Sequence, residues 1–178
     1  MSSLPLHPAI VHLPLGLAFL LPALAVGFAW ALWTGRIRSA GWSVIVALQL
    51  TLLGAGWFAM NTGERDEDRV EKVAPKAAIK AHEEFAEQFV WATGVTFVFA
   101  ALVPAFRRPR IVRVLTVASV AGTMVGAALA IRVGHAGGQL VYLHNAGAAY
   151  ASASRAADPA VGPSGSPAPA SPRQHDDR

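Results

Sequence analysis

The sequence predicts an all-α protein, an integral membrane four-helix bundle with a disordered C-terminal tail. Of its 178 residues, 53% are hydrophobic and 15% are charged, whereas a soluble domain carries about 25% charge. Four windows hold no Asp, Glu, Lys or Arg, and each reaches the roughly 18 residues that an α-helix needs to cross a bilayer core. These windows are residues 1–35, 39–63, 88–106 and 114–131. The composition excludes an ordinary soluble enzyme.

We place the four membrane spans at residues 9–33, 41–62, 85–106 and 111–133. Near the centre of a helix, each Leu, Ile, Phe or Val favours insertion by roughly 0.3–0.6 kcal/mol, whereas one Arg opposes it by about 2.5–3.5 kcal/mol. The spans form a membrane domain of residues 1–150. Residues 151–178 are rich in Ala, Ser, Gly and Pro, and they hold too little apolar surface to offset the entropy of ordering. They form the predicted tail.

The first span carries small residues at four- and seven-residue steps, a pattern that indicates a helix-packing face. They are Gly16, Ala23 and Gly27, and His12 continues the same stripe. We therefore expect His12 to point into the bundle. The second span carries Gln49, which we interpret as a hydrogen-bonding residue within the bundle.

We interpret residues 64–87 as helical extensions of the second and third spans, interrupted near Pro75 because proline cannot donate a helical hydrogen bond. The fourth span has a second small-residue stripe, after which we expect the helix to end at Gly137-Gly138. That stripe is Ala118, Gly122, Gly126 and Ala130. Five tryptophans near the predicted span ends are interpreted as interfacial anchors; they are Trp30, Trp33, Trp42, Trp57 and Trp91.

Arginines mark one side of the membrane. The first loop carries two and the third carries four, and neither loop holds an acidic residue; they are Arg36, Arg38, Arg107, Arg108, Arg110 and Arg113. The positive-inside rule makes this side cytoplasmic, which places the N-terminus, the second loop and the C-terminus outside. Although the pI is near 10.1, the arginines lie between apolar windows. Their expected partners are therefore the phosphates of the lipid bilayer and not nucleic acid.

The histidines are the best candidates for a functional site. His175 lies in the tail, and the other five lie at the outer ends of the spans: His7, His12, His82, His135 and His144. Imidazoles at similar depth in a four-helix bundle suit haem b or a transition-metal ion. A metal ion would use His12, His82 and His135, with Glu64 as a further candidate ligand. For any one of these histidines, an interfacial hydrogen bond is the more common role.

Helical spacing places His82 on one face with Phe85, Ala86 and Phe89, the apolar face of the third helix. There is no cysteine. The absence of thiols excludes an Fe–S cluster and covalently attached haem, because both need cysteine. A bound cofactor would therefore be non-covalent haem b or a metal ion held by nitrogen and oxygen ligands.

Two segments and the Gly63-Glu64 pair resemble a bacterial family of four-span membrane domains of unknown function, across about residues 4–150. Residues 7–14 match its HPxxVHxP motif, and residues 134–144 match its GHxGGxLVYxH motif. The resemblance implies a multi-pass protein of the bacterial inner membrane and a redox context, because relatives occur beside or fused to cytochrome c and Rieske-type modules. It assigns no catalytic residue. The family usually has Gly after the last histidine, whereas this chain has Asn145, which also tolerates a left-handed backbone.

These observations leave three functional hypotheses open, and they do not decide whether the protein is an enzyme. The first is a haem b or metal site that transfers electrons, with redox proteins such as cytochrome c or Rieske-type modules as partners. The second is a non-catalytic membrane scaffold or assembly subunit. The third is a transporter component, which is weakened because the membrane interior holds no ionisable residue to carry a proton or an ion.

Overall fold

The computed structural model describes residues 10–148. All four of its α-helices are long and apolar enough to cross a membrane, and no strand occurs in the described range. The predicted all-α fold is confirmed. In chain order the elements are α2 (His12–Trp33), η1 (Ser39–Trp42), α3 (Ser43–Val70), α4 (Lys76–Leu102), η2 (Val103–Ala105) and α5 (Pro109–Tyr142). The predicted tail, together with His7 and His175, lies outside the described residues.

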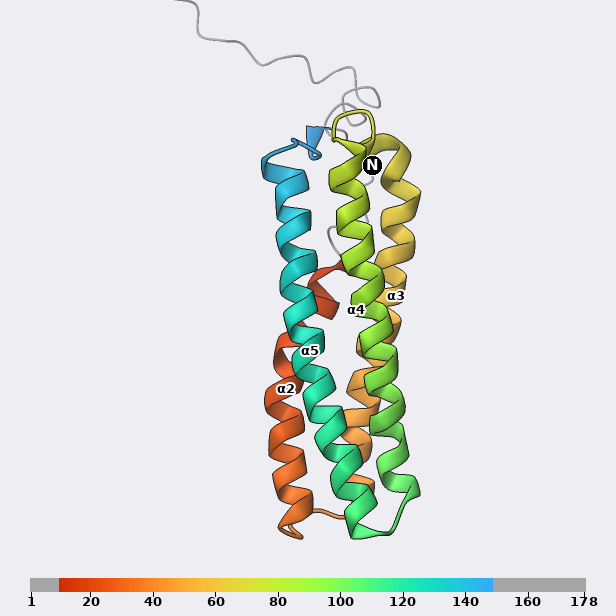
Figure 1. The fold of residues 1–178 in the computed structure, drawn as a ribbon, viewed down its shortest axis with the longest axis vertical. Helices are drawn as coiled ribbons and strands as arrows, with labels where there is room; N and C mark the ends of the chain where they lie inside the picture. Colours follow the sequence, from red (N-terminus) through yellow and green to blue (C-terminus); the bar gives the residue numbers. More distant parts are fainter. Residues whose placement is uncertain (1–9, 149–178) are drawn as a thin grey trace, which may run out of the picture.

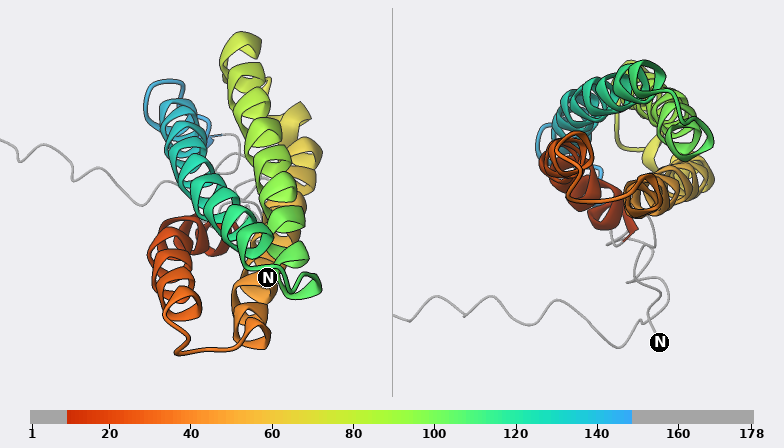
Figure 2. Two further views of the ribbon diagram at one scale, coloured as in Figure 1. Left: turned by 60° about the horizontal axis from the view of Figure 1, so that its bottom comes forward. Right: turned by 90° about the horizontal axis from the view of Figure 1, so that it is seen from below.

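The four helices form a closed ring. Each packs against the next along the chain, and α5 also packs against α2, as the end-on view in Figure 2 shows. Neighbouring helices run in opposite directions, and short loops at one end join α2 to α3 and α4 to α5 (Figure 1). The α3–α4 turn lies at the opposite end. This is the up-and-down connectivity of a four-helix bundle with short loops.

The helices differ in length. At 1.5 Å per residue, the 22 residues of α2 and the 34 residues of α5 correspond to about 33 Å and 51 Å. Because all four meet at the loop end, α3, α4 and α5 project past the start of α2 at the other end (Figure 1). The predicted extensions of the second and third spans are therefore confirmed, and α4 begins directly after Pro75.

Three apolar clusters follow one another along the bundle. The first, near the loop end, contains Ala29, Trp42, Ile45 and Val103. The second draws on all four helices and contains Ala18, Leu21, Leu52, Phe89 and Ala130. The third, near the α3–α4 turn, contains Ala74, Ile79, Leu140 and Ala146. The histidine-bearing segments of α4 and α5 lie between the second and third clusters.

Polar side chains are also buried in the bundle, and most of them bond to a helix backbone. Gln49 is 1% exposed, and its Nε2 donates to the carbonyl oxygen of Thr93 at 3.2 Å. The expectation that Gln49 forms a hydrogen bond within the bundle is confirmed. The hydroxyls of Thr96 and Ser119 donate to backbone carbonyls one turn earlier. Within residues 10–148, the Thr93 hydroxyl and the Gln49 Oε1 are buried without a hydrogen-bond partner.

Helix α5 does not end at Gly137-Gly138, as the sequence led us to expect. It continues to Tyr142, since a glycine in a helix interior costs only about 1 kcal/mol and Ala136 and Leu140 are buried on either side of the pair. The left-handed residue comes later, at Asn145, with a φ of 53°. The expectation that Asn145 supports this turn is confirmed.

Two further expectations about side chains in the bundle are wrong. The stripe of Gly16, Ala23 and Gly27 is exposed, and the buried face of α2 contains Pro14, Ala18, Leu21, Ala25 and Ala29 instead. Because α2 is apolar all round, its composition does not distinguish the two faces. Trp42 is not an exposed anchor: it is 0% exposed, and its Nε1 donates to the carbonyl oxygen of Ala100 at 3.2 Å.

Candidate functional site

Three of the six candidate site residues lie at one level of the bundle. Counted along their helices from the loop end, His12, Glu64 and His82 are 21, 21 and 20 residues away, a rise of about 30 Å. His135 is 26 residues from Pro109, a rise of about 39 Å. Since the hydrocarbon core of a bilayer is about 30 Å thick, these residues lie about one core thickness or more from the arginine loops. We call this region the histidine end.

His82 is the histidine that the fold brings into a helix interface. It is half-buried, with Phe89 buried two turns further along α4, so the expected apolar face is confirmed. Its Nδ1 lies 3.2 Å from the carbonyl oxygen of Val133 on α5. A carbonyl oxygen only accepts, so Nδ1 donates, and the lone pair of the neutral ring is on Nε2. The fold therefore sets the tautomer of His82.

Gly137 gives the His82 ring room to approach α5. A Cβ at position 137 would lie 3.2 Å from the ring Cε1 and 3.6 Å from Nδ1. Gly137 is one turn beyond Val133, so the two residues share a face of α5. The imidazole therefore bonds to the backbone oxygen of Val133 and packs in the space left by the missing side chain of Gly137.

His135 lies on the other side of the same helix. It is two positions from both Val133 and Gly137, a rotation of about 200°, and its side chain is exposed. Its Nε2 lies 3.2 Å from the Nε2 of Gln139, and because an amide nitrogen only donates, the imidazole Nε2 accepts. The structure therefore places the His135 side chain on the face of α5 away from the one that His82 contacts.

The remaining candidate residues are more open to the surroundings. His12, the first residue of α2, and Glu64 on α3 are both exposed, so the expectation that His12 points into the bundle is wrong. The physical reason is that His12 continues the small-residue stripe of α2, and this stripe faces outward. His144 is half-buried in the turn after α5, two residues before Ala146, which packs in the same cluster as Ile79 of α4.

The side chains at the histidine end suit haem better than a mononuclear metal centre. Among residues 10–148, leaving aside the side chains of Asp66 and Arg69, no three His, Cys, Asp or Glu side chains form a group that could hold a metal ion. A mononuclear metal centre uses three or four protein ligands, whereas haem iron is held by one or two axial ligands. An imidazole whose second ring nitrogen donates to a backbone carbonyl has the arrangement typical of a metal-ligating histidine. His82 fits a haem ligand in this respect.

Sequence reasoning did not find the two features that seat His82. The carbonyl oxygen of Val133 has no signal in the sequence, because any residue supplies one. Gly137 belongs to a visible Gly-Gly pair, which we interpreted as a helix end. The Gly-Gly pair could have indicated a close approach to α5, but naming His82 as the approaching group requires the register of α4 against α5.

Comparison with known proteins adds no family and no neighbour to this geometry. The chain matches no protein-family model, no curated protein sequence and no solved structure.

Proposed function

We propose that this multi-pass membrane protein binds haem b at its histidine end and uses it for electron transfer, with His82 as a residue that would hold the haem iron. The single observation that carries the proposal is the contact from His82 Nδ1 to the Val133 carbonyl. It orients the ring and leaves the lone pair on Nε2, which is the nitrogen that would ligate the iron. The bound haem would supply an iron that alternates between the ferric and ferrous states.

A second residue that would hold the haem has candidates but no assignment. His144 is the strongest, because it is half-buried beside the cluster that also contains Ile79, one turn from His82 on α4. His12 is exposed at the start of α2, and His7 lies outside the described residues. His135 ranks below these three, because it would have to give up its contact with Gln139.

The charge distribution supports an outward-facing histidine end. The loops between α2 and α3 and between α4 and α5, together with the first two turns of α5, carry six arginines and no acidic residue, so we propose that they lie in the cytoplasm of a bacterium, at its inner membrane. The histidine end would then face redox proteins outside the membrane, such as cytochrome c or Rieske-type modules. The family resemblance in residues 4–150 supports the same redox context.

A second candidate function is a non-catalytic scaffold or assembly subunit. It is favoured by the lack, among the side chains that the structure describes, of any group of three able to hold a metal ion. In this case the tautomer of His82 would serve only the packing of α4 on α5.

The test is to express the full chain with a haem precursor and with added transition metals, purify it in detergent, and record its visible spectrum oxidised and reduced. Our proposal predicts a Soret band, an α band on reduction and close to one haem per chain. A colourless protein without haem would contradict it. If bound metal is then found in stoichiometric amount, a mononuclear centre replaces haem; if none is found, the scaffold function stands.

A further inference from the structure

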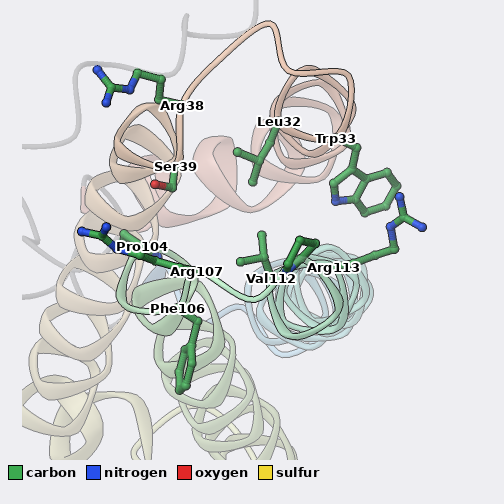
Figure 3. A pocket seen from close by; sticks show the side chains of 10 residues that line it. Leu32, Trp33, Arg38, Ser39, Pro104, Phe106, Arg107, Val112 and Arg113 are labelled. Atoms are coloured by element: carbon green, nitrogen blue, oxygen red, sulfur yellow. The ribbon is translucent and has the colours of Figure 1, made fainter.

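The loop end of the bundle has a hollow that the proposed function does not use. It has a volume of about 550 Å³ and lies between the end of α2, the first loop, and the loop and first turn that lead into α5. Its lining includes three arginines, Arg38, Arg107 and Arg113, together with Trp33 and Phe106. Figure 3 shows the hollow from close by. It combines positive charge with aromatic walls at the level where the helices leave the bilayer.

The arginines stand in two places on the rim. In Figure 3, the guanidinium groups of Arg38 and Arg107 lie on one side, and Arg113 lies on the other, beside Trp33. The Arg113 guanidinium is 5.7 Å from the centre of the Trp33 ring, and Trp33 Nε1 donates to Thr116 Oγ1 at 3.0 Å. Arg113 is therefore paired with an aromatic ring, whereas the side chains of Arg38 and Arg107 extend outward on the other side.

The described chain supplies no anion to neutralise these charges. Residues 1–63 and 88–157 contain no Asp or Glu, and the acidic side chains of α3 and α4 begin at Glu64, about 30 Å away along the helix. The start of α5 adds to the positive potential, because its first turn has no acidic residue and no side-chain cap. The hollow therefore favours an anionic occupant from outside the chain.

We infer that this hollow binds the phosphate of an anionic phospholipid headgroup, held by Arg38 and Arg107. Guanidinium groups suit phosphate because they offer paired N–H donors in a plane. Basic pockets between transmembrane helices are suited to anionic lipid headgroups. The apolar part of the hollow favours a lipid over free phosphate: Leu32 and Val112 lie between the two arginine positions in Figure 3, where the glycerol backbone and the start of the acyl chains would lie.

The chain offers a matched control for the test. Arg36 and Arg110 belong to the same two loop regions as Arg38 and Arg107, and neither lines the hollow. Arg36 is instead stacked at 4.2 Å over the ring of Trp30. The double variants Arg38→Gln/Arg107→Gln and Arg36→Gln/Arg110→Gln therefore remove equal charge from the same end of the protein, but only the first changes the hollow.

The experiment titrates the delipidated full-length protein in detergent with phosphatidylglycerol, phosphatidylcholine or inorganic phosphate and counts bound molecules by native mass spectrometry. We expect wild type and the Arg36/Arg110 variant to bind phosphatidylglycerol within about twofold of each other. We expect the Arg38/Arg107 variant to need at least about tenfold more lipid, since Arg38 and Arg107 line the hollow and each would lose a direct charge-assisted hydrogen bond to the phosphate, worth several-fold or more in binding. Phosphatidylcholine should bind wild type at least tenfold more weakly.

Three results would overturn the inference. Equal losses in the two double variants would mean that total charge, and not the hollow, holds the lipid. Equal binding of phosphatidylcholine would remove the role of anionic charge. Inorganic phosphate that binds wild type with one-to-one stoichiometry and displaces phosphatidylglycerol at equal concentration would make the hollow a site for free phosphate. Thermal unfolding of both double variants checks that they remain folded.

Discussion

His82 of α4 donates from Nδ1 to the backbone carbonyl of Val133 on α5, 3.2 Å away. The bond joins two helices at the histidine end of the bundle. Val133 is already within a continuous helix, so its oxygen accepts this bond through its second lone pair. The contact has two consequences, one for packing and one for chemistry: it fixes the distance between α4 and α5 at this level, and it sets the tautomer of His82.

The packing consequence predicts different results for neighbouring glycines. In a helix interior, Gly→Ala stabilises by about 0.5–1 kcal/mol when the new methyl group meets nothing. A Cβ at Gly138 meets no atom within 4 Å, whereas one at Gly137 comes to 3.2 Å from the His82 ring. Gly138→Ala should therefore raise the unfolding temperature in detergent, and Gly137→Ala should not. Equal gains in both variants would mean that the ring is not seated at Gly137.

Gly122 is the second place where α4 and α5 approach closely. A Cβ there would overlap the Thr96 side chain, whereas a Cβ at the buried Gly126 meets nothing within 4 Å. Gly122→Ala should destabilise the bundle by about 1–3 kcal/mol, as expected for overpacking. Gly126→Ala should be neutral or mildly stabilising. Adding Thr96→Ala should restore part of the loss at Gly122, and a double variant no more stable than Gly122→Ala alone would contradict this account of the contact.

Two buried threonines should respond in opposite ways to valine. The hydroxyl of Thr93 is buried without a hydrogen-bond partner in the described range, so Thr93→Val removes an unsatisfied group and should stabilise by up to about 1 kcal/mol. Thr116 Oγ1 accepts from Trp33 Nε1 at 3.0 Å. Thr116→Val leaves that indole N–H without its acceptor and should cost about 1–3 kcal/mol. Denaturation of the purified variants measures both changes in stability. A loss of stability in Thr93→Val as large as that in Thr116→Val would contradict the conclusion that the Thr93 hydroxyl is unsatisfied.

The four helices could be predicted because their physical cause is local. Whether a charge-free window is long enough to cross a bilayer depends only on its own residues, and Pro75 interrupts a helix whatever surrounds it. The helix ends and the buried faces depend on contacts between helices. Gly137-Gly138 looked like a helix end because glycine is common there, and only the position of His82 shows that the missing side chain serves packing.

The candidate site was predicted only in part, because its level along the bundle has a local cause and the directions of its side chains depend on contacts between helices. The count of charge-free windows is enough to place the histidines at one end of the bundle. It is not enough to predict which way each histidine side chain points. Helix α2 has two faces of similar apolar character, and the buried face is not the one that carries His12. His82 was placed correctly because Phe85, Ala86 and Phe89 make only one side of α4 apolar at this level.

The arginine loops predict the orientation of the protein. With the loops after Trp33 and Leu102 in the cytoplasm, a reporter joined after Tyr150 should lie outside. In a bacterial host, alkaline phosphatase fused there should be active and a green fluorescent protein should be dark. The same reporters inserted after Arg107 should give the reverse pattern. Fluorescence after Tyr150 without phosphatase activity would invert the orientation and place the histidine end in the cytoplasm.

The central claim, that His82 ligates haem, is tested most directly by the Soret band of the purified haem-loaded protein and of two histidine variants from the same end. His82→Gly should lose most of the band, and added imidazole should restore it, because a small ligand can replace the missing ring where a packing defect would persist. His135→Gly should keep it, since that ring accepts from Gln139 on the far side of α5. A band that survives in His82→Gly, or disappears only in His135→Gly, would contradict the account.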